Sequence, residues 1–317
     1  MDIQKALKKS IDRRQLLGNL GMMGAGAVLT ACGGVVAQPP AEDKNYDAAI
    51  LNFALNLEYL EAAFYLAAVG RIDELPGGDA EIVLPAGFDG KTALAFTTPA
   101  VAEYANEIAT DELNHVVFLR TALADVLKVS VAPRPKLDFA NAFAGAANTA
   151  FGATLDPVFN PFANELFFLH GAFIFEDVGV TAYNGAAPYV TDKPTVLQKA
   201  AGILAVEAYH AGEIRTLLYQ QKDVDTPYGV KVEAVVEAIS KLRATVGGGK
   251  DQGLVVDGKA NIVVADENSV AFARTPREVA NIVFLDTTNA ALKGGFYPDG
   301  LSIPADLADG FGFLLSL

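Results

Sequence analysis

The 317-residue sequence predicts an all-α protein whose centre is a four-helix bundle built from two similar helical hairpins. Two observations lead to this prediction. Long segments rich in Ala and Leu are bounded by helix-capping signals, whereas strand signals are confined to one short stretch. In addition, the spacing E-x-x-H-x-x-x-x-R-T occurs twice, beginning at Glu112 and at Glu207, which indicates a duplicated helical unit.

Composition excludes several classes of protein and site. With 51% hydrophobic residues, the chain has enough apolar surface for a large core, and its net charge of −14 argues against binding to nucleic acid. A single Cys rules out an internal disulfide and a zinc or iron–sulfur site held by several thiolates. Imidazole ligands must come from the three histidines, His115, His170 and His210.

The N-terminal segment 1–31 is predicted to be an export signal peptide. Five basic side chains precede an apolar, Gly-rich stretch that is too short and too interrupted to cross a bilayer comfortably. The pair Arg13-Arg14 resembles a twin-arginine signal, which implies export of a folded protein across the inner membrane. The alternative is an ordinary amphipathic tail.

The only cysteine, Cys32, follows Leu-Thr-Ala in a pattern that resembles a bacterial lipobox. We therefore expect lipidation at Cys32, with the chain anchored in the periplasm or cell envelope without spanning the membrane. Residues 32–44 would form a flexible tether. Loss of 1–31 removes five basic and two acidic side chains, so the mature net charge becomes −17.

The first hairpin is predicted from two long helices. Residues 45–70 lack Gly and Pro until Gly70, and 71–98 reads as a long loop because glycines and prolines interrupt it. Thr98-Pro99 then supplies an N-cap and a first-turn proline for a helix to about Lys128. Residues 136–158 suggest a short helix and a turn.

The second hairpin and a C-terminal extension follow the same capping logic. The expected elements are a helix from Asn160-Pro161 to about 185, a helix over about 194–222, a helix from Thr226-Pro227 to the glycines at 247–249, a hairpin or extended loop within 250–274, a helix from the capping box at Thr275 to about 293, and loops over 294–317. The predicted domains are the bundle over 45–246 and the extension over 247–317, packed on the bundle.

The repeated Glu-x-x-His pairs, Glu112/His115 and Glu207/His210, are the strongest chemical signal in the chain. On a helix, residues three apart share a face, so each pair can present a carboxylate and an imidazole to one point. Carboxylate oxygens with one imidazole nitrogen suit iron or manganese.

The preceding helices also repeat a pattern, since Glu58 is followed seven residues later by Tyr65, and Glu176 by Tyr183. The chain therefore reads as two copies of a hairpin with Glu and Tyr on its first helix and Glu-x-x-His on its second. A bundle with pseudo-two-fold symmetry would bring four carboxylates and two imidazoles together, which is enough for two metal ions.

This arrangement resembles the ferritin-like di-iron or di-manganese carboxylate bundles. The segments NFALNLEYLE at 52–61, RTP at 274–276 and GGFYP at 294–298 are similar to those of a ferritin-like subfamily of exported bacterial proteins and plant desiccation-related proteins. Carried over position by position, the resemblance implies these metal ligands: Glu58, Glu112, His115, Glu176, Glu207 and His210.

The resemblance also implies roles within the set. Glu112 and Glu207 would bridge the metals, and Tyr65 and Tyr183 would lie beside them as hydrogen-bonding or redox-active residues. Glu61, one turn after Glu58, is an extra or alternative ligand.

Structural roles are the alternative for several of these residues. Glu213 is a weaker ligand candidate, and Arg120 and Arg215 could neutralise the carboxylates in a purely structural arrangement. Tyr65 and Tyr183 could be core residues. His170 has no partner at metal-binding spacing and is expected to be structural.

The implied cofactor is two iron ions, with two manganese ions as the alternative. Such a centre would oxidise Fe(II) or consume O₂ or peroxide in envelope stress protection, as a ferroxidase, a peroxidase or a catalase. The second hypothesis is a non-catalytic metal-binding or structural protein of desiccation or stress protection. The long loop and the extension argue against a ferritin-like storage cage, so we expect a monomer or a small oligomer.

Overall fold

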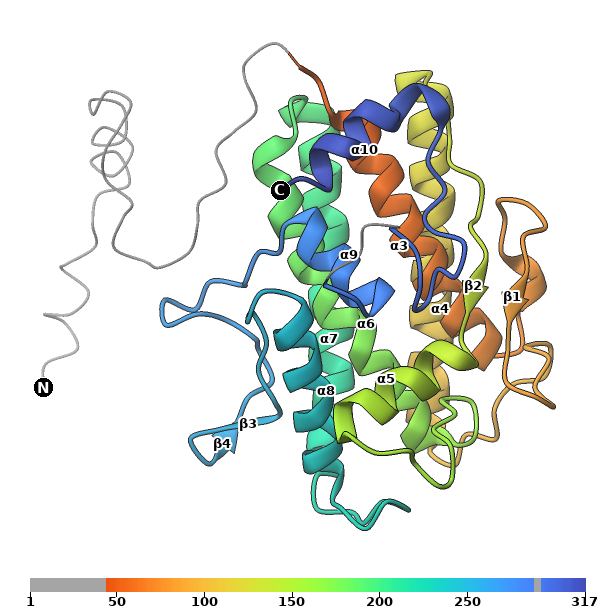
Figure 1. Cartoon of the computed structure of the whole chain (residues 1–317), viewed down its shortest axis with the longest axis vertical. Helices are drawn as coiled ribbons and strands as arrows, with labels where there is room; N and C mark the ends of the chain where they lie inside the picture. Colours follow the sequence, from red (N-terminus) through yellow and green to blue (C-terminus); the bar gives the residue numbers. More distant parts are fainter. Residues whose placement is uncertain (1–43, 288–291) are drawn as a thin grey trace, which may run out of the picture. The chain divides into compact units, whose positions relative to one another are not determined.

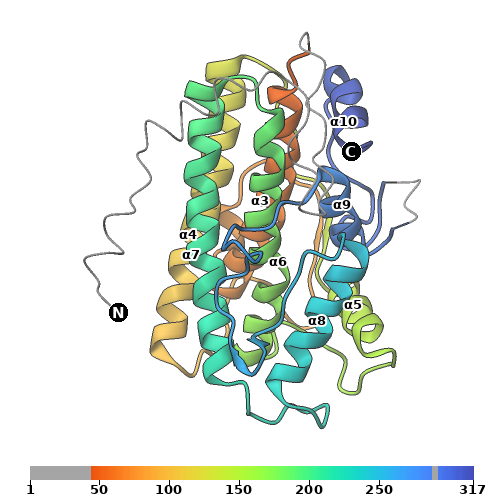
Figure 2. The same ribbon diagram turned by 90° about the vertical axis from the view of Figure 1, so that its left-hand side faces the viewer.

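Four long helices form the centre of the structure, and neighbouring helices run antiparallel (Figures 1 and 2). They are α3 (Asp47–Ala68), α4 (Pro99–Thr121), α6 (Glu165–Ala186) and α7 (Gln198–Gln220). The main contacts pair α3 with α4 and α6 with α7, and α3 also packs against α6. The predicted all-α bundle of two hairpins is therefore confirmed.

The computed structural model describes residues 44–287 and 292–317. The predicted signal peptide, Cys32 and nearly all of the predicted tether lie outside these residues. The bundle and the C-terminal extension belong to one compact unit.

Shorter elements surround the four helices. They are α5 (Asn141–Phe151), α8 (Val232–Val246), α9 (Pro276–Phe284), α10 (Ala308–Leu314), the 3₁₀ turns Ile72–Glu74, Ala187–Tyr189 and Ala305–Leu307, and the π-helical turns Ala122–Leu127 and Lys193–Leu197. The strands β1 (Ile82–Val83) and β2 (Leu137–Asp138) pair in parallel, with Ile82 opposite Leu137. The antiparallel strands β3 (Val255–Val256) and β4 (Lys259–Ala260) form a hairpin within the stretch where a hairpin or loop was expected.

Two helices begin later than their proline signals suggested. The predicted start at Asn160-Pro161 is wrong, because the side chain of Asn164 caps α6 by accepting the Phe167 N–H group. The start at Thr226-Pro227 is also wrong. The Thr226 N–H and hydroxyl groups both donate to the Val230 carbonyl, which makes a turn before α8.

The C-terminal extension differs from its prediction at two points. The capping box at Thr275 is present, but α9 ends at Phe284 because Leu285 adopts a left-handed backbone conformation, with φ of 56°. The tail was expected to be loops only, yet it contains α10. This short helix forms because it has apolar surface to bury: it packs against α3, and Phe313 stacks on Tyr46 at 4.1 Å between ring centroids.

One helix within the described ranges, Glu165–Tyr189, is long and apolar enough to cross a membrane by length and composition. Its most apolar stretch is 89% buried inside the protein. The apolar character of this segment is therefore explained by its place in the core, where α6 contacts α3, α7, α8 and α9.

Candidate metal centre

The six predicted ligands converge inside the bundle, and each of the four long helices contributes at least one. All six side chains are buried. They are Glu58 on α3, Glu112 and His115 on α4, Glu176 on α6, and Glu207 and His210 on α7. The structure thus brings together residues that are up to 152 positions apart in the sequence.

The first group of ligand atoms surrounds His115. Its Nδ1 atom lies 3.2 Å from Glu58 Oε2, 3.6 Å from Glu112 Oε2 and 3.5 Å from Glu207 Oε1. One atom from each of these four side chains lies within 4.8 Å of the others, so the group can hold one metal ion.

The second group surrounds His210 in the same way. Its Nδ1 atom lies 3.1 Å from Glu112 Oε1 and 3.4 Å from Glu176 Oε2, and Glu207 completes the group. Glu112 and Glu207 belong to both groups. They are therefore the two residues that could bridge a pair of metal ions.

The polar atoms of this cluster fit a dinuclear metal centre. Both carboxylate oxygens of Glu112 and of Glu207, together with His210 Nδ1, are buried without a hydrogen-bond partner. Burying such groups is costly unless a cation or a donor compensates them. Four carboxylates carry up to four negative charges, which two divalent ions would neutralise, and the donor set suits iron or manganese.

Protons take the place of cations in the metal-free cluster. Burial lowers the pKa of His210, but the charges of Glu176 and Glu112 outweigh this effect and raise it to about 12. Burial raises the pKa of Glu58 to about 7 against the opposing effect of His115. Burial and the neighbouring carboxylates raise the pKa of Glu207 well above its ordinary value. Metal binding must therefore displace protons from the site.

Each of the two tyrosines hydrogen-bonds to a candidate ligand of the other hairpin. Tyr65 on α3 donates a hydrogen bond to Glu176 Oε1 on α6, and Tyr183 on α6 donates one to Glu58 Oε1 on α3. Seven residues span almost two helical turns, so Glu and Tyr share a face about 10 Å apart. Because α3 and α6 are antiparallel, each Tyr reaches the Glu of the other helix. The repeated Glu-x₆-Tyr spacing is thereby explained.

The two histidines differ in how their second nitrogen is held. Asp111 Oδ2 lies 3.3 Å from His210 Nε2 and can orient that ring for coordination through Nδ1. Asp111 directly precedes Glu112, and its counterpart in the second hairpin is Val206, which directly precedes Glu207. Val206 has no polar side-chain atom, so it cannot orient the His115 ring by a hydrogen bond. The six candidate ligands therefore follow pseudo-two-fold symmetry, but the residues that contact the two histidines do not.

Glu61 lies beside the cluster but in neither four-ligand group, so Glu58 is the α3 residue placed for coordination. Glu61 matches Gly179 in the second hairpin, since each follows a ligand by three residues. A methyl group on Gly179 would lie 2.1 Å from Glu207 Oε2 and 3.5 Å from Glu61 Oε1. Gly179 therefore makes room for the two carboxylates.

The arginines of the repeated motif do not neutralise the ligands. Arg120 donates to the Tyr59 hydroxyl at 2.5 Å, and Arg215 pairs with Asp177 at 2.9 Å. Tyr59 and Asp177 each follow a ligand glutamate directly in sequence. The arginines thus hold the residues next to Glu58 and Glu176, which leaves the ligand carboxylates free for cations.

Two other predicted positions lie outside the groups. His170 is fully buried beside the backbone of Leu166 and Val232, and burial lowers its pKa to about 4. It is therefore a neutral core residue. Glu213 is half-buried on α7 and belongs to neither group.

Sequence reasoning missed Asp111 and Gly179. The sequence contained a signal for each residue, which appears when the two hairpins are aligned. Before the Glu-x-x-His pairs, Asp111 aligns with Val206. On the first helix of each hairpin, Glu61 aligns with Gly179.

Comparison with known proteins agrees with this geometry. The pattern of the ferritin-like domain family matches residues 46–220, which contain all six candidate ligands. The chain belongs to the ferritin-like domain family. No solved structure matches it significantly.

Two curated plant proteins are similar over most of the ferritin-like chain. The desiccation-related protein PCC13-62 of Craterostigma plantagineum is 38% identical over 249 residues, covering 73% of this chain and 75% of that protein. The ferritin-like catalase Nec2 of Nesocodon mauritianus is 30% identical over 267 residues, covering 80% and 83%.

Proposed function

We propose that this ferritin-like protein binds two iron or manganese ions and disproportionates hydrogen peroxide to water and O₂. The observation that carries the proposal is the pair of four-ligand groups that share Glu112 and Glu207. The name of one relative, a ferritin-like catalase, supports the choice of peroxide. The net reaction turns two peroxide molecules into two water molecules and one O₂ molecule, so it needs no external reductant.

A bound metal pair would donate two electrons to one peroxide molecule, giving water, and accept two electrons from a second, giving O₂. The protein's own residues would fix the geometry. Tyr65 donates to one oxygen of Glu176, whose other oxygen faces His210. In the same way, Tyr183 donates to one oxygen of Glu58, whose other oxygen faces His115. Asp111 holds the His210 ring. Burial of the ligands keeps bulk water from competing for the metals.

The test is oxygen release from hydrogen peroxide by protein reconstituted with Mn(II) or Fe(II), followed with an oxygen electrode. We expect turnover with two metal ions per chain, and loss of both metal and turnover in Glu112→Gln and Glu207→Gln. Glu103→Gln is the matched control, because Glu103 is exposed on the same helix as Glu112. It should keep both.

Other outcomes would replace this proposal. Two bound ions that consume O₂ with Fe(II) but release none from peroxide would identify a ferroxidase. Bound metal without either reaction would support the non-catalytic role that a desiccation-related relative suggests. An intact fold with no metal would refute the dinuclear centre itself.

We also propose that the chain is exported by the twin-arginine route and anchored through a lipid on Cys32. The supporting observations are Arg13-Arg14 and the Leu-Thr-Ala-Cys sequence. Replacing both arginines by lysine should keep the protein in the cytoplasm of a bacterial host. Cys32→Ser should move exported protein from the membrane to the soluble fraction, and unchanged distribution in either variant would overturn that part of the proposal.

A further inference from the structure

A second site lies beside the metal centre, in a cavity of about 160 Å³. It is bordered by α3, α6, the start of α7 and the C-terminal end of α4, and it opens to solvent. Its lining includes Leu51, Phe118, Val126, Tyr183, Ala200 and Ile203. Both π-helical turns, Ala122–Leu127 and Lys193–Leu197, contribute to its walls. Such turns interrupt regular helices and are frequent at functional sites.

The chemistry of the walls selects an apolar occupant. The lining is almost wholly carbon; its one formal charge is the ammonium group of Lys199, which is exposed. An engineered cavity of about 150 Å³ with Leu, Ile and Phe walls stays dry and binds benzene. The cavity next to Tyr183 has a similar volume and a mostly apolar wall, although it is open to solvent, so it suits a molecule with one aromatic ring or a short branched alkyl chain.

The mouth of the cavity leaves large apolar side chains open to solvent. Phe118 is 39% exposed and Val126 is 59% exposed, and both line the cavity. Apolar surface at the entrance of an apolar cavity is stabilised when a ligand removes it from water. A ligand that enters between α4 and α7 would cover these two side chains.

The cavity is connected to the metal centre through one side chain. Tyr183 forms part of the cavity wall, and its hydroxyl donates to Glu58, a candidate ligand. A molecule in the cavity would therefore lie against a residue that touches the metal centre. The neighbouring cavity of about 30 Å³ shares Leu51, Tyr183 and Ala200 with it and extends the same apolar space.

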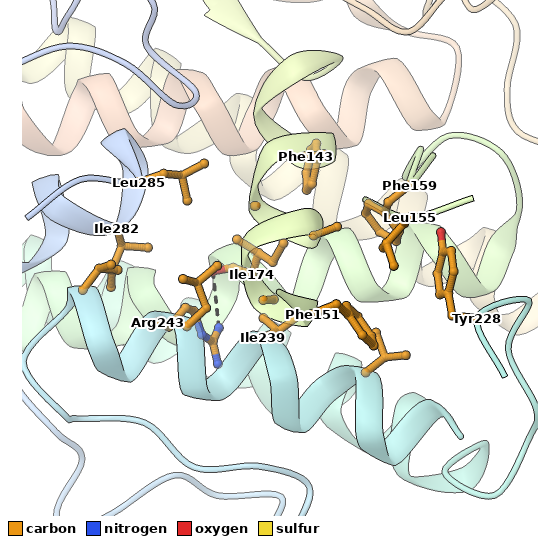
Figure 3. A pocket seen from close by; sticks show the side chains of 16 residues that line it. Phe143, Phe151, Leu155, Phe159, Ile174, Tyr228, Ile239, Arg243, Ile282 and Leu285 are labelled. Carbon is orange, nitrogen blue, oxygen red and sulfur yellow. Dashed lines mark hydrogen bonds between the residues drawn. The ribbon is translucent and has the colours of Figure 1, made fainter. Parts of the chain in front are cut away.

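Another apolar cavity, between α5, α8 and α9, is a weaker candidate (Figure 3). Its volume is about 30 Å³, which is too small for a ring. Arg243 lies on its wall, with Nη1 3.3 Å from the Ile174 carbonyl oxygen. Among the described residues, no side chain that lines this cavity hydrogen-bonds to a candidate ligand.

We propose that the cavity beside Tyr183 binds one small, uncharged aromatic or branched-alkyl molecule. The site is built from this chain's own residues, and its binding does not require the metals. It therefore stands or falls separately from the peroxide reaction.

The probe is toluene, titrated calorimetrically into the full chain in its metal-free and metal-loaded forms. We expect one toluene per chain in both forms. In crystals soaked with toluene, density should appear between Phe118, Tyr183 and Ala200. Ala200→Phe should weaken binding at least tenfold, because the new ring fills the cavity.

Ala201→Phe is the matched control, since Ala201 is the next residue of α7, is exposed and does not line the cavity. It should bind toluene as the natural chain does. Ala200→Leu fills less space and replaces the Phe variant if thermal unfolding shows that the latter does not fold. Absence of binding, unchanged binding in the folded Ala200 variant, or density only between α5 and α8 would each overturn the proposal.

Discussion

At the scale of single residues, the geometry of the candidate metal centre depends on side chains outside the six candidate ligands. Gly179 is the clearest case. Because glycine has no side chain, it leaves room for the Glu207 carboxylate, which belongs to both the His115 group and the His210 group. In an ordinary helix interior, Ala is more stable than Gly by about 0.5–1 kcal/mol. At residue 179, Ala would instead displace a buried carboxylate.

We therefore expect Gly179→Ala to lower the metal content of the purified protein while the fold is kept, because the methyl group would lie 2.1 Å from Glu207 Oε2. Gly202→Ala is the control, since Gly202 is in α7 with open space around it. It should keep the full metal content and gain about 0.5–1 kcal/mol of stability. Full metal content in Gly179→Ala would show that Glu207 is not a bridge.

The crossed tyrosines give a prediction with internal symmetry. Tyr65→Phe and Tyr183→Phe each remove one hydrogen bond to a candidate ligand, Glu176 or Glu58. Loss of such a supporting bond weakens metal affinity by about 10- to 100-fold. Competition with a chelator should show a similar loss for both variants. Unchanged affinity in both would mean that the tyrosines are only core residues.

At the scale of elements, buried ion pairs fasten the extension to the bundle. Asp177 on α6 pairs with Arg215 on α7 and Arg243 on α8, at 2.9 and 2.7 Å. Asp251 pairs with Arg243 at 2.8 Å and with Arg274 at 2.9 Å. These five side chains are all buried or nearly so, and Arg243 also stacks over the Phe173 ring.

Removing Asp251 would leave Arg243 with one carboxylate partner instead of two and Arg274 with none. Breaking a buried pair in this way costs about 3–5 kcal/mol. We expect Asp251→Ala to lower the free energy of unfolding by that amount in urea titrations. Asp125→Ala, at an exposed position of the turn Ala122–Leu127, should change it by less than about 0.5 kcal/mol. Equal effects would contradict the fastening role.

The helix starts were predicted correctly where the capping residue directly precedes the helix, and wrongly where a turn lies between the signal and the helix. Capping at Thr98 and Thr275 located two helix starts, because those positions precede helices directly. The proline signals at Asn160 and Thr226 failed, because local hydrogen bonds form turns there and the helices begin at later residues. The short α10 was missed, since its stability comes from contacts with α3 rather than from local sequence.

The candidate site was more predictable than the helix ends. Glu58, Glu112 and His115, with their counterparts in the second hairpin, follow from a repeated spacing, and a repeat fixes which faces meet. Glu61 and Glu58 could not be separated, because both lie on the same helix face one turn apart. The contact between Asp111 and His210 could not be predicted, because it depends on the direction of the two side chains, which the sequence spacing does not determine.

At the scale of the whole molecule, stability should depend on pH through His170. Burial lowers its pKa in the folded chain to about 4, against about 6.5 when it is exposed. Below pH 6.5 the unfolded chain binds a proton that the folded chain does not. Stability is therefore lost as the pH falls from 6.5 to 4, by up to about 3 kcal/mol from this residue.

This contribution can be isolated with metal-free protein. Urea unfolding of the natural chain and of His170→Leu at several pH values should show a steeper loss for the natural chain between pH 6.5 and 4. Parallel curves would mean that His170 is protonated in the folded protein.

The central claim is that Glu112 and Glu207 bridge two metal ions, each beside one histidine. Anomalous diffraction at the iron and manganese absorption edges, on crystals of the reconstituted protein, tests it most directly. We expect two peaks per chain, one next to His115 Nδ1 and one next to His210 Nδ1, with the Glu112 and Glu207 carboxylates between them. A single peak, or none among these six side chains, would contradict it.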